Sequence, residues 1–474
     1  MQNLKLAKPQ PQKTSNVKTL RQDRSTISDM RCFLHVGQDE WEIVDYSAFG
    51  IAVLSLHGFP DQHEIPRAQV RMENHELATV SLLKVREEAT EKGMKTAFEI
   101  TSDPLSIEKF NVFPEIWKIA KSLEREHQKL CAIPRAFTVT VFELKHLLEA
   151  FEKKIVHLEA VQTFTSQAQI DDYEATVIDV AGSAIHQFWT VAHDEMERIL
   201  RDEPVEVVKA AFEFFREQLK ALVYQSPFAH RSLQKPFGYA GDYEMMNLIY
   251  HNERLGKSLF GRCMERCFLE HAEPQAVRNR VEYLLAKIRL TVKEKPGKKV
   301  TVLSVACGPA MEVQKFIEQA PQAELDAVEF HLLDQDLGAL KHVQRRLRKI
   351  ATGMGKKVEV KLIGTTIKNM IHSGLEHEGY DLIYSAGLFD YFTDQVATLA
   401  ASVLYESLAP GSRLIIGNFD VSAPTRFGMS MVFDWNLIYR TGEDLRRIFG
   451  IPGAALSIEK EDCGVNLFCN LAKK

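Results

Sequence analysis

The sequence contains no long apolar run. No stretch of 18 consecutive apolar residues occurs in its 474 residues, whereas a helix that crosses a membrane needs about 20. Residues 1–20 carry lysines among prolines and glutamines, but no apolar segment of the kind that a secretory leader contains. We therefore expect a protein that has no membrane span and stays in the cytoplasm.

Cysteine and excess positive charge are also scarce. The seven cysteines are too few and too scattered for a secreted disulfide scaffold, which fits a reducing compartment. The 59 lysines and arginines are outnumbered by 64 aspartates and glutamates, giving a net charge of -5. A protein that binds a phosphate backbone usually has a basic excess. We therefore expect no nucleic-acid partner.

What the chain does have is length and a 45% hydrophobic content, enough for more than one core. Along the chain, the residue pattern changes from polar to one typical of strands, then to one typical of helices, and finally to one of strands that alternate with helices. The sequence thus predicts a multidomain protein. The expected parts are a flexible tail over 1–20, a small β-barrel over 21–105, a helical linker and lid region over 106–295, and a doubly wound, Rossmann-like α/β domain over 296–474.

The periodicity of apolar residues supports these divisions. Five short runs of β-branched and aromatic residues lie between turn formers, at 32–36, 41–47, 50–59, 78–88 and 94–100. Helical periodicity then takes over and is clearest over 142–161, where apolar residues return to one side. Near Pro296 the pattern changes to apolar strands separated by helices, which is typical of a parallel sheet covered on both faces.

The first strand of this last region runs into a turn of small residues. Residues 300–305 are followed by Ala306, Gly308 and Ala310, a diluted glycine-rich loop, and then by a helix. In a doubly wound sheet the end of the first strand lies at the crevice where ligands bind. Small residues there let the backbone approach a ligand closely. A simple strand-to-helix turn is the alternative interpretation.

An acidic residue ends the second strand. Asp334 follows Gly308 by about 26 residues, at a place where a carboxylate can accept hydrogen bonds from both ribose hydroxyls. The alternative is that Asp334 or Asp336 merely caps the helix that begins near Leu337.

Two later motifs complete the pattern. The strand over 380–385 ends in Ser385 and Gly387, and residues 404–419 read as a helix, a Pro-Gly turn and a strand. In this order and spacing, over about 120 residues, the motifs resemble those of class I S-adenosylmethionine-dependent methyltransferases. A dinucleotide-binding dehydrogenase is disfavoured because G-x-G-x-x-G is absent.

The resemblance implies S-adenosylmethionine as the cofactor, with its methionine part near Gly308 and its ribose on Asp334. The chain departs from the family pattern at Ser304, where the family usually has an acidic residue, and at the loop positions occupied by alanine. The cofactor-binding residues implied are Ala306, Gly308, Asp334, Ser385 and Gly387.

The segment before the sheet domain is a candidate for the acceptor site. Residues 235–250 combine glycines, tyrosines and an aspartate in a loop that leads into a helix, which favours a lid or, alternatively, a domain-docking turn. With 380–392 and 434–441, it resembles a bacterial group described as extracellular-factor 3-hydroxypalmitic acid methyl ester biosynthesis proteins. That resemblance implies a small-molecule acceptor, a fatty-acid carboxylate or similar acid.

Transfer to a carboxylate is an in-line displacement that needs alignment and exclusion of water, but no general base. An arginine can orient such an acceptor with two hydrogen bonds; for Arg278 and Arg280 the alternative is a solvated helix face. A hydroxyl or amine acceptor would instead need Asp242 or Asp390 to take its proton. The candidate catalytic residues are Tyr239, Asp242, Tyr243, Arg278, Arg280, Asp390 and Tyr391.

Cys263, Cys267 and His271 recur at helical spacing and suggest a metal site at first sight. One helix face supplies few ligands, however, and no second pair lies nearby in the sequence. A packed thiol stripe is the simpler interpretation, and we expect no metal.

The N-terminal strands contain D-x-S-x-x-G, formed by Asp45, Ser47 and Gly50. With the strand over 94–100, this motif resembles a PilZ domain over about 20–105. The resemblance implies cyclic di-GMP as ligand, a signalling role, and Arg31 as the second arginine of the family's R-x-x-x-R stretch; the first falls on Ile27.

Two alternatives to this interpretation remain. The motif could be a plain turn, in which Asp45 and Ser47 bond to local backbone and Gly50 takes a positive φ. A degenerate barrel that docks partners would look the same.

For the whole chain, the rival to an enzyme is a signalling or scaffold protein that binds S-adenosylmethionine without turnover, because fold alone does not decide function.

Overall fold

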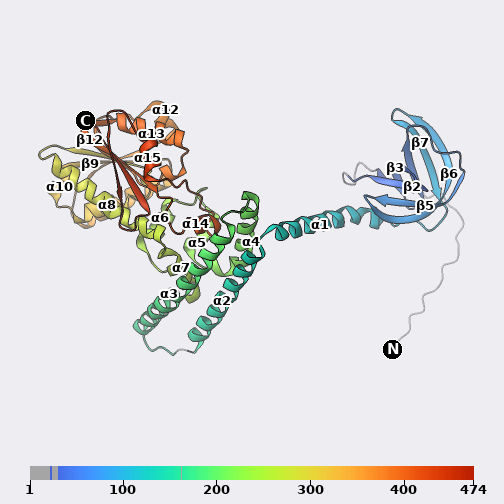
Figure 1. Ribbon diagram of the computed structural model, residues 1–474, viewed down its shortest axis with the longest axis horizontal. Helices are drawn as coiled ribbons and strands as arrows, with labels where there is room; N and C mark the ends of the chain where they lie inside the picture. The colour runs from blue at the N-terminus through green and yellow to red at the C-terminus, as the bar shows by residue number, and fades with distance from the viewer. Residues whose placement is uncertain (1–21, 24–29, 162) are drawn as a thin grey trace. The chain divides into compact units, whose positions relative to one another are not determined.

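A computed structural model describes residues 22–23, 30–161 and 163–474 of the chain (Figure 1). The tail expected over 1–20 lies outside the described residues. Within this part of the chain, no helix combines the length and the apolarity that a membrane span requires.

The contacts divide the chain into two compact units, residues 1–129 and 130–474. The division falls inside helix α1 (Ile107–Ala132), whereas the sequence changes from strands to helices near residue 105. The first turns of α1 belong to the strand unit, because the Nζ of Lys109 donates a hydrogen bond of 2.7 Å to the carbonyl of Leu77. The helices after α1 and the C-terminal sheet form one unit.

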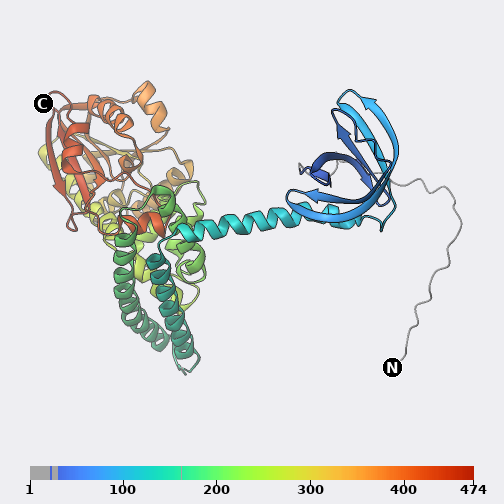
Figure 2. The same cartoon turned by 45° about the vertical axis from the view of Figure 1, so that its right-hand side comes forward.

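In its described residues, the first unit contains antiparallel strands that close into a barrel (Figure 2). The strand order is β1-β3-β2-β5-β6-β7-β4, and an additional pairing of β3 with β4 completes the closure. Alternate residues such as Leu34, Val53 and Val70 turn inward and are fully buried. The small barrel expected from the sequence is thereby confirmed. The strands are β1 (Gln22–Asp23), β2 (Cys32–Val36), β3 (Asp39–Ser47), β4 (Gly50–Ser55), β5 (Glu64–Met72), β6 (His75–Thr90) and β7 (Gly93–Ile100).

One barrel strand, β5, is not among the five predicted runs. Its sequence, EIPRAQVRM, contains Pro66, and a proline within a run argues against a central strand. The chain accommodates Pro66 at an irregularity of the ladder with β6, between Ile65 and Ala68. A bulge leaves a residue unpaired, so the missing N–H of proline costs no ladder hydrogen bond.

The second unit begins with helices that share one core. Their apolar stripes meet around Trp189, Phe215, Phe228 and Phe268, which are all buried. Figures 1 and 2 show α2 and α3 side by side. The helices are α2 (Arg135–Ala160), α3 (Gln167–Leu200), α4 (Val205–Val223), α5 (Pro227–Gln234), α6 (Tyr243–His251), α7 (Leu259–Leu269) and α8 (Ala272–Glu294).

The rest of the unit is a sheet of order β10-β9-β8-β11-β12-β14-β13. The five strands from β10 to β12 are parallel, and β14 runs antiparallel to both of its neighbours. The predicted doubly wound α/β domain is confirmed; the last two strands were not predicted. The elements are β8 (Val300–Val305), α9 (Met311–Gln319), α10 (Gln322–Asp326), β9 (Val328–Asp334), α11 (Leu337–Gly353), β10 (Glu359–Gly364), α12 (Ile367–Ser373), β11 (Tyr380–Ser385), α13 (Asp394–Glu406), β12 (Leu408–Phe419), α14 (Arg426–Met431), α15 (Gly442–Ile448), β13 (Ala455–Lys460) and β14 (Asn466–Ala472).

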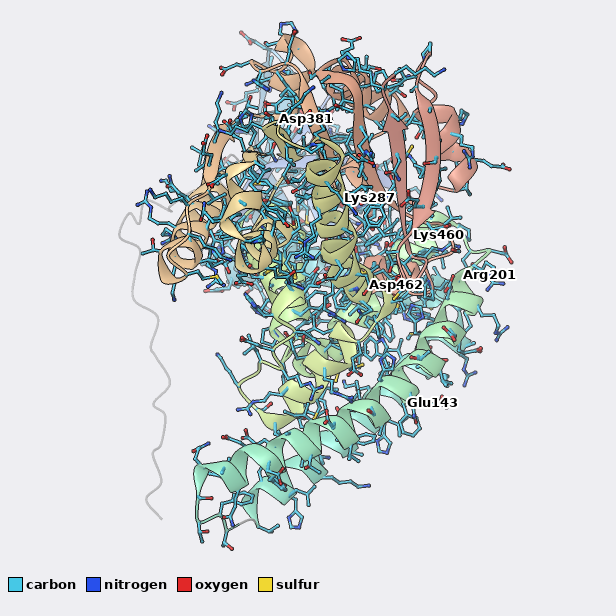
Figure 3. The ribbon with its side chains drawn as sticks, turned by 90° about the vertical axis from the view of Figure 1, so that its left-hand side faces the viewer. Glu143, Arg201, Lys287, Asp381, Lys460 and Asp462 are labelled. Atoms are coloured by element: carbon cyan, nitrogen blue, oxygen red, sulfur yellow. The ribbon has the colours of Figure 1, made fainter. Side chains whose placement is uncertain are left out.

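Helices cover both faces of this sheet. Successive residues of β8 point to opposite sides, so Val302 packs with α8, α9 and α11 while Leu303 packs with α12, α13 and α15. Helix α8 lies along the sheet (Figure 3), where Lys287 forms an ion pair of 2.7 Å with Glu459 and Lys295 pairs with Asp381. These contacts fix α8, the last helix before the sheet, against the strands that carry the site.

The connection between β12 and α15 leaves the sheet and joins the helical core. Met431, Phe433 and Trp435 of this segment are buried among the helices. Ser232 donates a hydrogen bond of 2.9 Å to the carbonyl of Phe433, and Tyr224 donates one of 2.8 Å to the carbonyl of Val432. The helical region and the sheet are therefore joined over the carboxyl end of the sheet.

Candidate active site

A cavity of about 350 Å³ opens at the carboxyl ends of β8, β9 and β11. This edge is where open α/β sheets bind their ligands, at the point where the chain order reverses between β8 and β11. Helices α6 and α8 close the cavity from the other side. Its lining includes Tyr239, Gly241, Tyr243, Met246, Tyr250, Arg280, Ser304, Ala306, Gly308, Glu312, Asp334, Tyr384, Gly387 and Tyr391.

The loop after β8 adopts an unusual backbone. Ala306, Gly308 and Ala310 have φ values of 53°, 51° and 48°, the left-handed region that favours glycine. The alanines thus occupy positions where the sequence pattern calls for glycine. An alanine in this conformation costs about 1–3 kcal/mol of folding free energy. The fold nevertheless keeps this loop conformation beside the cavity.

Asp334 fastens this loop to the second strand. One carboxylate oxygen accepts a hydrogen bond of 2.9 Å from the Gly308 N–H, and the other accepts one of 2.9 Å from the N–H of Asp336. Asp336, not Asp334, caps α11 by accepting from the Gly338 N–H at 2.7 Å. Burial raises the pKa of Asp334, and its backbone donors oppose that rise. Lone pairs on both oxygens remain for hydroxyl donors within the cavity.

A second buried carboxylate lines the same cavity. Glu312, in the first turn of α9, accepts a hydrogen bond of 2.7 Å from the hydroxyl of Tyr384 on β11. Burial raises the pKa of Glu312. Neither residue was a sequence candidate, although an acid two residues after the last loop alanine is a signal that the sequence offers.

Arg280 lies deep in the site. It is 8% exposed, and its guanidinium donates to the hydroxyl of Tyr250 at 3.0 Å and to the carbonyl of Ala386 at 3.3 Å. No carboxylate among the described residues forms an ion pair with it. The buried carboxyls of Asp390 and Glu312 interact with its charge without direct contact, so an anionic ligand in contact with the guanidinium would be favoured.

A smaller space of about 50 Å³ adjoins the main cavity. The two share Gly241, Met246, Arg280, Gly387 and Tyr391 in their linings. Most other lining side chains are apolar, apart from Glu273 and Asp390. The apolar ones are Phe228, Ile249, Pro274, Val277, Phe419, Met429, Trp435 and Leu437.

The three tyrosines predicted from the sequence, Tyr239, Tyr243 and Tyr391, all lie at the main cavity, and Tyr391 also lines the smaller space. The hydroxyl of Tyr391 accepts a hydrogen bond of 2.7 Å from the indole of Trp435. A Cβ on Gly241 would lie 2.8 Å from that hydroxyl, so the loop passes closely over both rings.

The other predicted residues have different positions. Asp242 caps α6 and forms a two-point ion pair with Arg231, outside the cavity lining. Arg278 donates to the carbonyls of Ile249 and Leu269 and lines neither of the two cavities. Both therefore hold helices in place and line neither cavity, and their contact with an acceptor stays a prediction.

Asp390 and Ser385 make hydrogen bonds that hold the backbone around the site. Asp390 lines the smaller space and accepts a hydrogen bond of 2.7 Å from the N–H of Phe419; burial raises its pKa to about 6. The Ser385 hydroxyl donates to the carbonyl of Val305 at 3.1 Å, joining β11 to β8. Gly387 lines both cavities beside Arg280.

Three of the candidate ligand residues of the barrel, Asp45, Ser47 and Gly50, lie where β3 turns into β4. Arg31 comes just before β2, whose Phe33 pairs with Glu42 in the first half of β3. Asp45 lies 3.9 Å from the Nζ of Lys95, and Ser47 accepts from the N–H of Phe49 at 3.4 Å.

The plain-turn alternative is wrong on one point. Gly50 is absent from the glycines with positive φ and begins β4, where it pairs with Ser47. A Cβ there would lie 3.2 Å from the carbonyl oxygen of Phe98, so close packing explains this glycine.

Comparisons with solved structures give remote similarities. A possible exported protein from Bordetella parapertussis shares 19% identity, covering 54% of this chain and 95% of its own, with a TM-score of 0.40. Magnesium protoporphyrin IX methyltransferase from Synechocystis, with bound S-adenosylhomocysteine, shares 11%, covering 43% and 87%, with a TM-score of 0.33. N-methyltransferase NodS from Bradyrhizobium japonicum shares 16%, covering 42% and 87%, with a TM-score of 0.30.

No curated protein matches the chain. A family model described as "Putative methyltransferase" matches residues 168–416. The match runs from α3 to β12 and so includes the helices over the cavity, the loop after β8, and Asp334. Because it spans more than half of the 474 residues, the chain belongs to this family of putative methyltransferases.

Proposed function

We propose that the protein transfers a methyl group from S-adenosylmethionine to a small carboxylic acid with an apolar chain. The observation that carries this proposal is the position of Arg280, a buried guanidinium without a carboxylate partner among the described residues, at the boundary of the two cavities. The larger cavity holds the methyl donor, and the smaller, mostly apolar space receives the carbons next to the acceptor carboxylate.

The residues around the larger cavity fit the parts of the donor. Asp334 accepts hydrogen bonds from the ribose hydroxyls, and the loop at Gly308 lets the backbone approach the methionine part. Glu312 takes the place of the family's usual acid, which is Ser304 here, and holds the ammonium group of the methionine part. An ion pair inside the cavity would compensate the cost of burying Glu312.

The acceptor carboxylate lies on Arg280, whose charge favours an anion and whose Nη1 carries a second N–H besides the one donated to the carbonyl of Ala386. The neighbouring apolar side chains, among them Phe228, Met429 and Trp435, pack against the acyl chain. Alignment and exclusion of water carry the rate enhancement, because the acceptor is already anionic at neutral pH.

The bound donor supplies an electrophilic methyl group on a positively charged sulfur. One carboxylate oxygen of the acceptor forms the new bond to the methyl carbon, the sulfur–methyl bond breaks, and its electron pair stays on sulfur. The products are a methyl ester and S-adenosylhomocysteine, and no proton moves. Arg280 keeps the attacking oxygen aligned, and Tyr391 with Trp435 covers the site from water.

Calorimetric titration with S-adenosylmethionine tests the donor site, and the same titration on Asp334→Ala should give little heat. Transfer of a labelled methyl group to saturated and 3-hydroxylated fatty acids then tests the acceptor. The expected product is an ester that alkali hydrolyses. Donor binding without transfer to any acid would favour the rival, a protein that binds the donor as a signalling or scaffold component.

Regulation through the barrel belongs to the same proposal. The barrel binds cyclic di-GMP through Arg31, with Asp45 and Ser47 alongside, and the bound ligand changes the rate of methyl transfer. The test is calorimetry with cyclic di-GMP on the full chain, on Arg31→Ala and on Arg67→Ala, a control in an exposed part of β5. Binding that Arg31→Ala abolishes supports the assignment; no binding to the parent protein leaves a docking role.

A further inference from the structure

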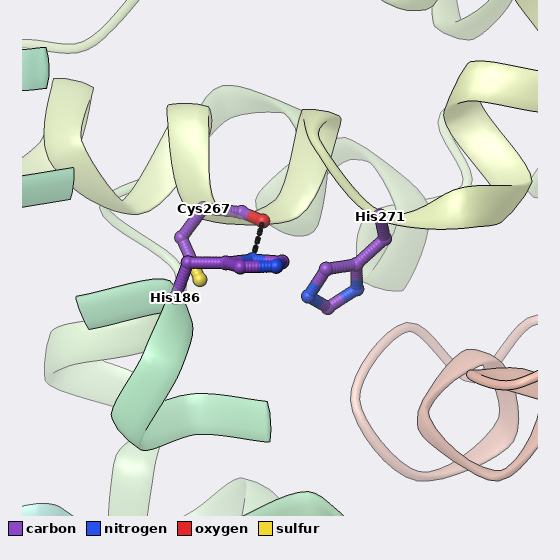
Figure 4. Close-up of side chains that lie close together, drawn as sticks. All are labelled: His186, Cys267 and His271. Carbon is purple, nitrogen blue, oxygen red and sulfur yellow. Dashed lines mark hydrogen bonds between the residues drawn. The ribbon is translucent and has the colours of Figure 1, made fainter. Parts of the chain in front are cut away.

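Three side chains from three different helices converge away from the cavities. His186 comes from α3, Cys267 from the last turn of α7, and His271 from the position just before α8, where its side chain makes no capping hydrogen bond. Their ligand atoms all lie within 4.8 Å of one another, and Figure 4 shows the two imidazole rings facing each other beside the cysteine. We propose that His186, Cys267 and His271 bind a divalent transition-metal ion of the zinc type.

The hydrogen bonds leave the imidazoles ready to bind a metal. The Nδ1 of His186 lies 3.1 Å from the carbonyl oxygen of Cys267, so it carries the proton and its Nε2 lone pair is free. A backbone carbonyl that holds the outer nitrogen is the usual support of a metal-bound histidine. The same contact orients the ring relative to the cysteine that would be its co-ligand.

His271 gives an independent indication. It is 7% exposed, and its Nε2 has no hydrogen-bond partner among the described residues. Buried polar atoms almost always have a partner, so an orphaned nitrogen calls for an explanation. In Figure 4 a nitrogen of this ring points toward His186.

The geometry suits a small tetrahedral ion. With bonds of about 2.0–2.3 Å, the ligands of a tetrahedral zinc site lie roughly 3.4–3.7 Å apart. The present spread of up to 4.8 Å therefore needs a contraction of about 1 Å, within reach of side-chain rotation. Two imidazoles and a thiolate favour zinc over calcium or magnesium, which prefer oxygen. As the sulfur–metal bond forms, the thiol proton of Cys267 passes to solvent.

The expectation of no metal rested on the cysteine stripe of one helix. The structure changes the ligand set, because Cys263 is not in the group and the further ligand, His186, lies 81 residues before Cys267. A bound ion would tie α3 and α7 to the start of α8, the helix that carries Arg280. The site would thus hold the helical part of the unit together.

The test is a titration of untagged, metal-free full-length protein with Co²⁺ alone, followed by competition with Zn²⁺. We expect saturation near one ion per chain, a sulfur-to-cobalt charge-transfer band, and the visible bands of tetrahedral cobalt. Cys267→Ser should lose the charge-transfer band, and His186→Gln should weaken binding by more than the ~10–100-fold typical of losing an outer hydrogen bond. Cys263→Ser, one turn away, should keep both.

Because the side chain of His186 is only partly buried, His186→Gln should disturb folding least among these variants. Circular dichroism of each metal-free variant checks that it folds. Zinc should also raise the melting temperature of the parent protein but not that of His186→Gln. Failure of the parent to give a saturable cobalt spectrum overturns the proposal, as does an unchanged charge-transfer band in folded Cys267→Ser.

Discussion

A Cβ atom on Gly387 would lie 2.8 Å from Nη1 of Arg280. The loop after β11 therefore sets where the guanidinium can lie, and any larger residue at 387 must push it aside. Gly387→Ala is expected to lower kcat/KM for a carboxylate acceptor about 10–100-fold, because misplacement by about 1 Å costs that much in alignment. Donor affinity should change little. Initial-rate kinetics and donor calorimetry on the same variant separate the two effects.

Gly353→Ala is the matched control for this prediction. Gly353 ends α11, has no positive φ, and a Cβ there would meet nothing within 4 Å. This variant should keep full activity. Equal losses in the two variants would show that the first effect does not come from Arg280.

Asp334 and Asp336 separate binding from stability. Asp334→Ala removes the carboxylate that lines the cavity and holds the Gly308 loop, so donor affinity should fall at least about 10-fold, the loss of roughly 1.4 kcal/mol. Asp336→Ala removes the cap of α11 and should cost about 1 kcal/mol of unfolding free energy. Calorimetry and urea denaturation on both variants measure the two quantities. Equal donor affinities in the two variants would contradict the assignment of Asp334.

The sequence predicts those parts of the site that follow a strand end directly. Gly308 and Asp334 fall at the carboxyl ends of neighbouring strands, and parallel strands bring such ends together whatever packs around them. Arg278 and Arg280 show the limit. They lie two residues apart on α8, on sides about 200° apart, so only one can face the cavity, and the packing of the whole helix decides which.

Contacts between segments far apart in the sequence could not be predicted, for the same reason. Glu312 contacts Tyr384, which lies 72 residues further along the chain, and His186 contacts Cys267, which lies 81 residues further along. Neither pair has a local pattern that periodicity or spacing can detect. Asp242 shows the converse: its position in the loop before a helix indicated a catalytic acid, whereas in the structure it caps α6 and forms an ion pair with Arg231.

The left-handed alanines of the loop after β8 lead to a stability prediction. Replacing Ala306 or Ala310 by glycine removes the strain of a positive φ, at the cost of a more flexible unfolded chain. Each substitution should raise the free energy of unfolding by about 0.5–1 kcal/mol. Ala327→Gly, where φ is −86°, should instead lower it. Urea denaturation of the three variants decides the sign, and destabilisation by all three would contradict the role of strain.

Asp390 makes the unfolding free energy depend on pH. Burial raises its pKa from 3.8 to about 6, so the folded chain binds its proton more tightly than the unfolded chain does. The resulting stability is fully present below about pH 4 and is lost as pH rises to about 6, and this difference in pKa corresponds to about 3 kcal/mol. Glu265 and Glu273, whose pKa values burial raises to about 7, add a second decline at higher pH.

Asp390→Asn isolates the contribution of this one carboxyl. The amide oxygen can still accept the hydrogen bond from the Phe419 N–H, but it does not titrate. The difference in unfolding free energy between parent and variant should therefore change between about pH 4 and 6 and stay level above that range. Activity gives a second result from the same variant. A carboxylate acceptor needs no base, so Asp390→Asn should keep most of its kcat at about pH 7.5, whereas a hydroxyl acceptor would make the loss of Asp390 cost about 100-fold or more.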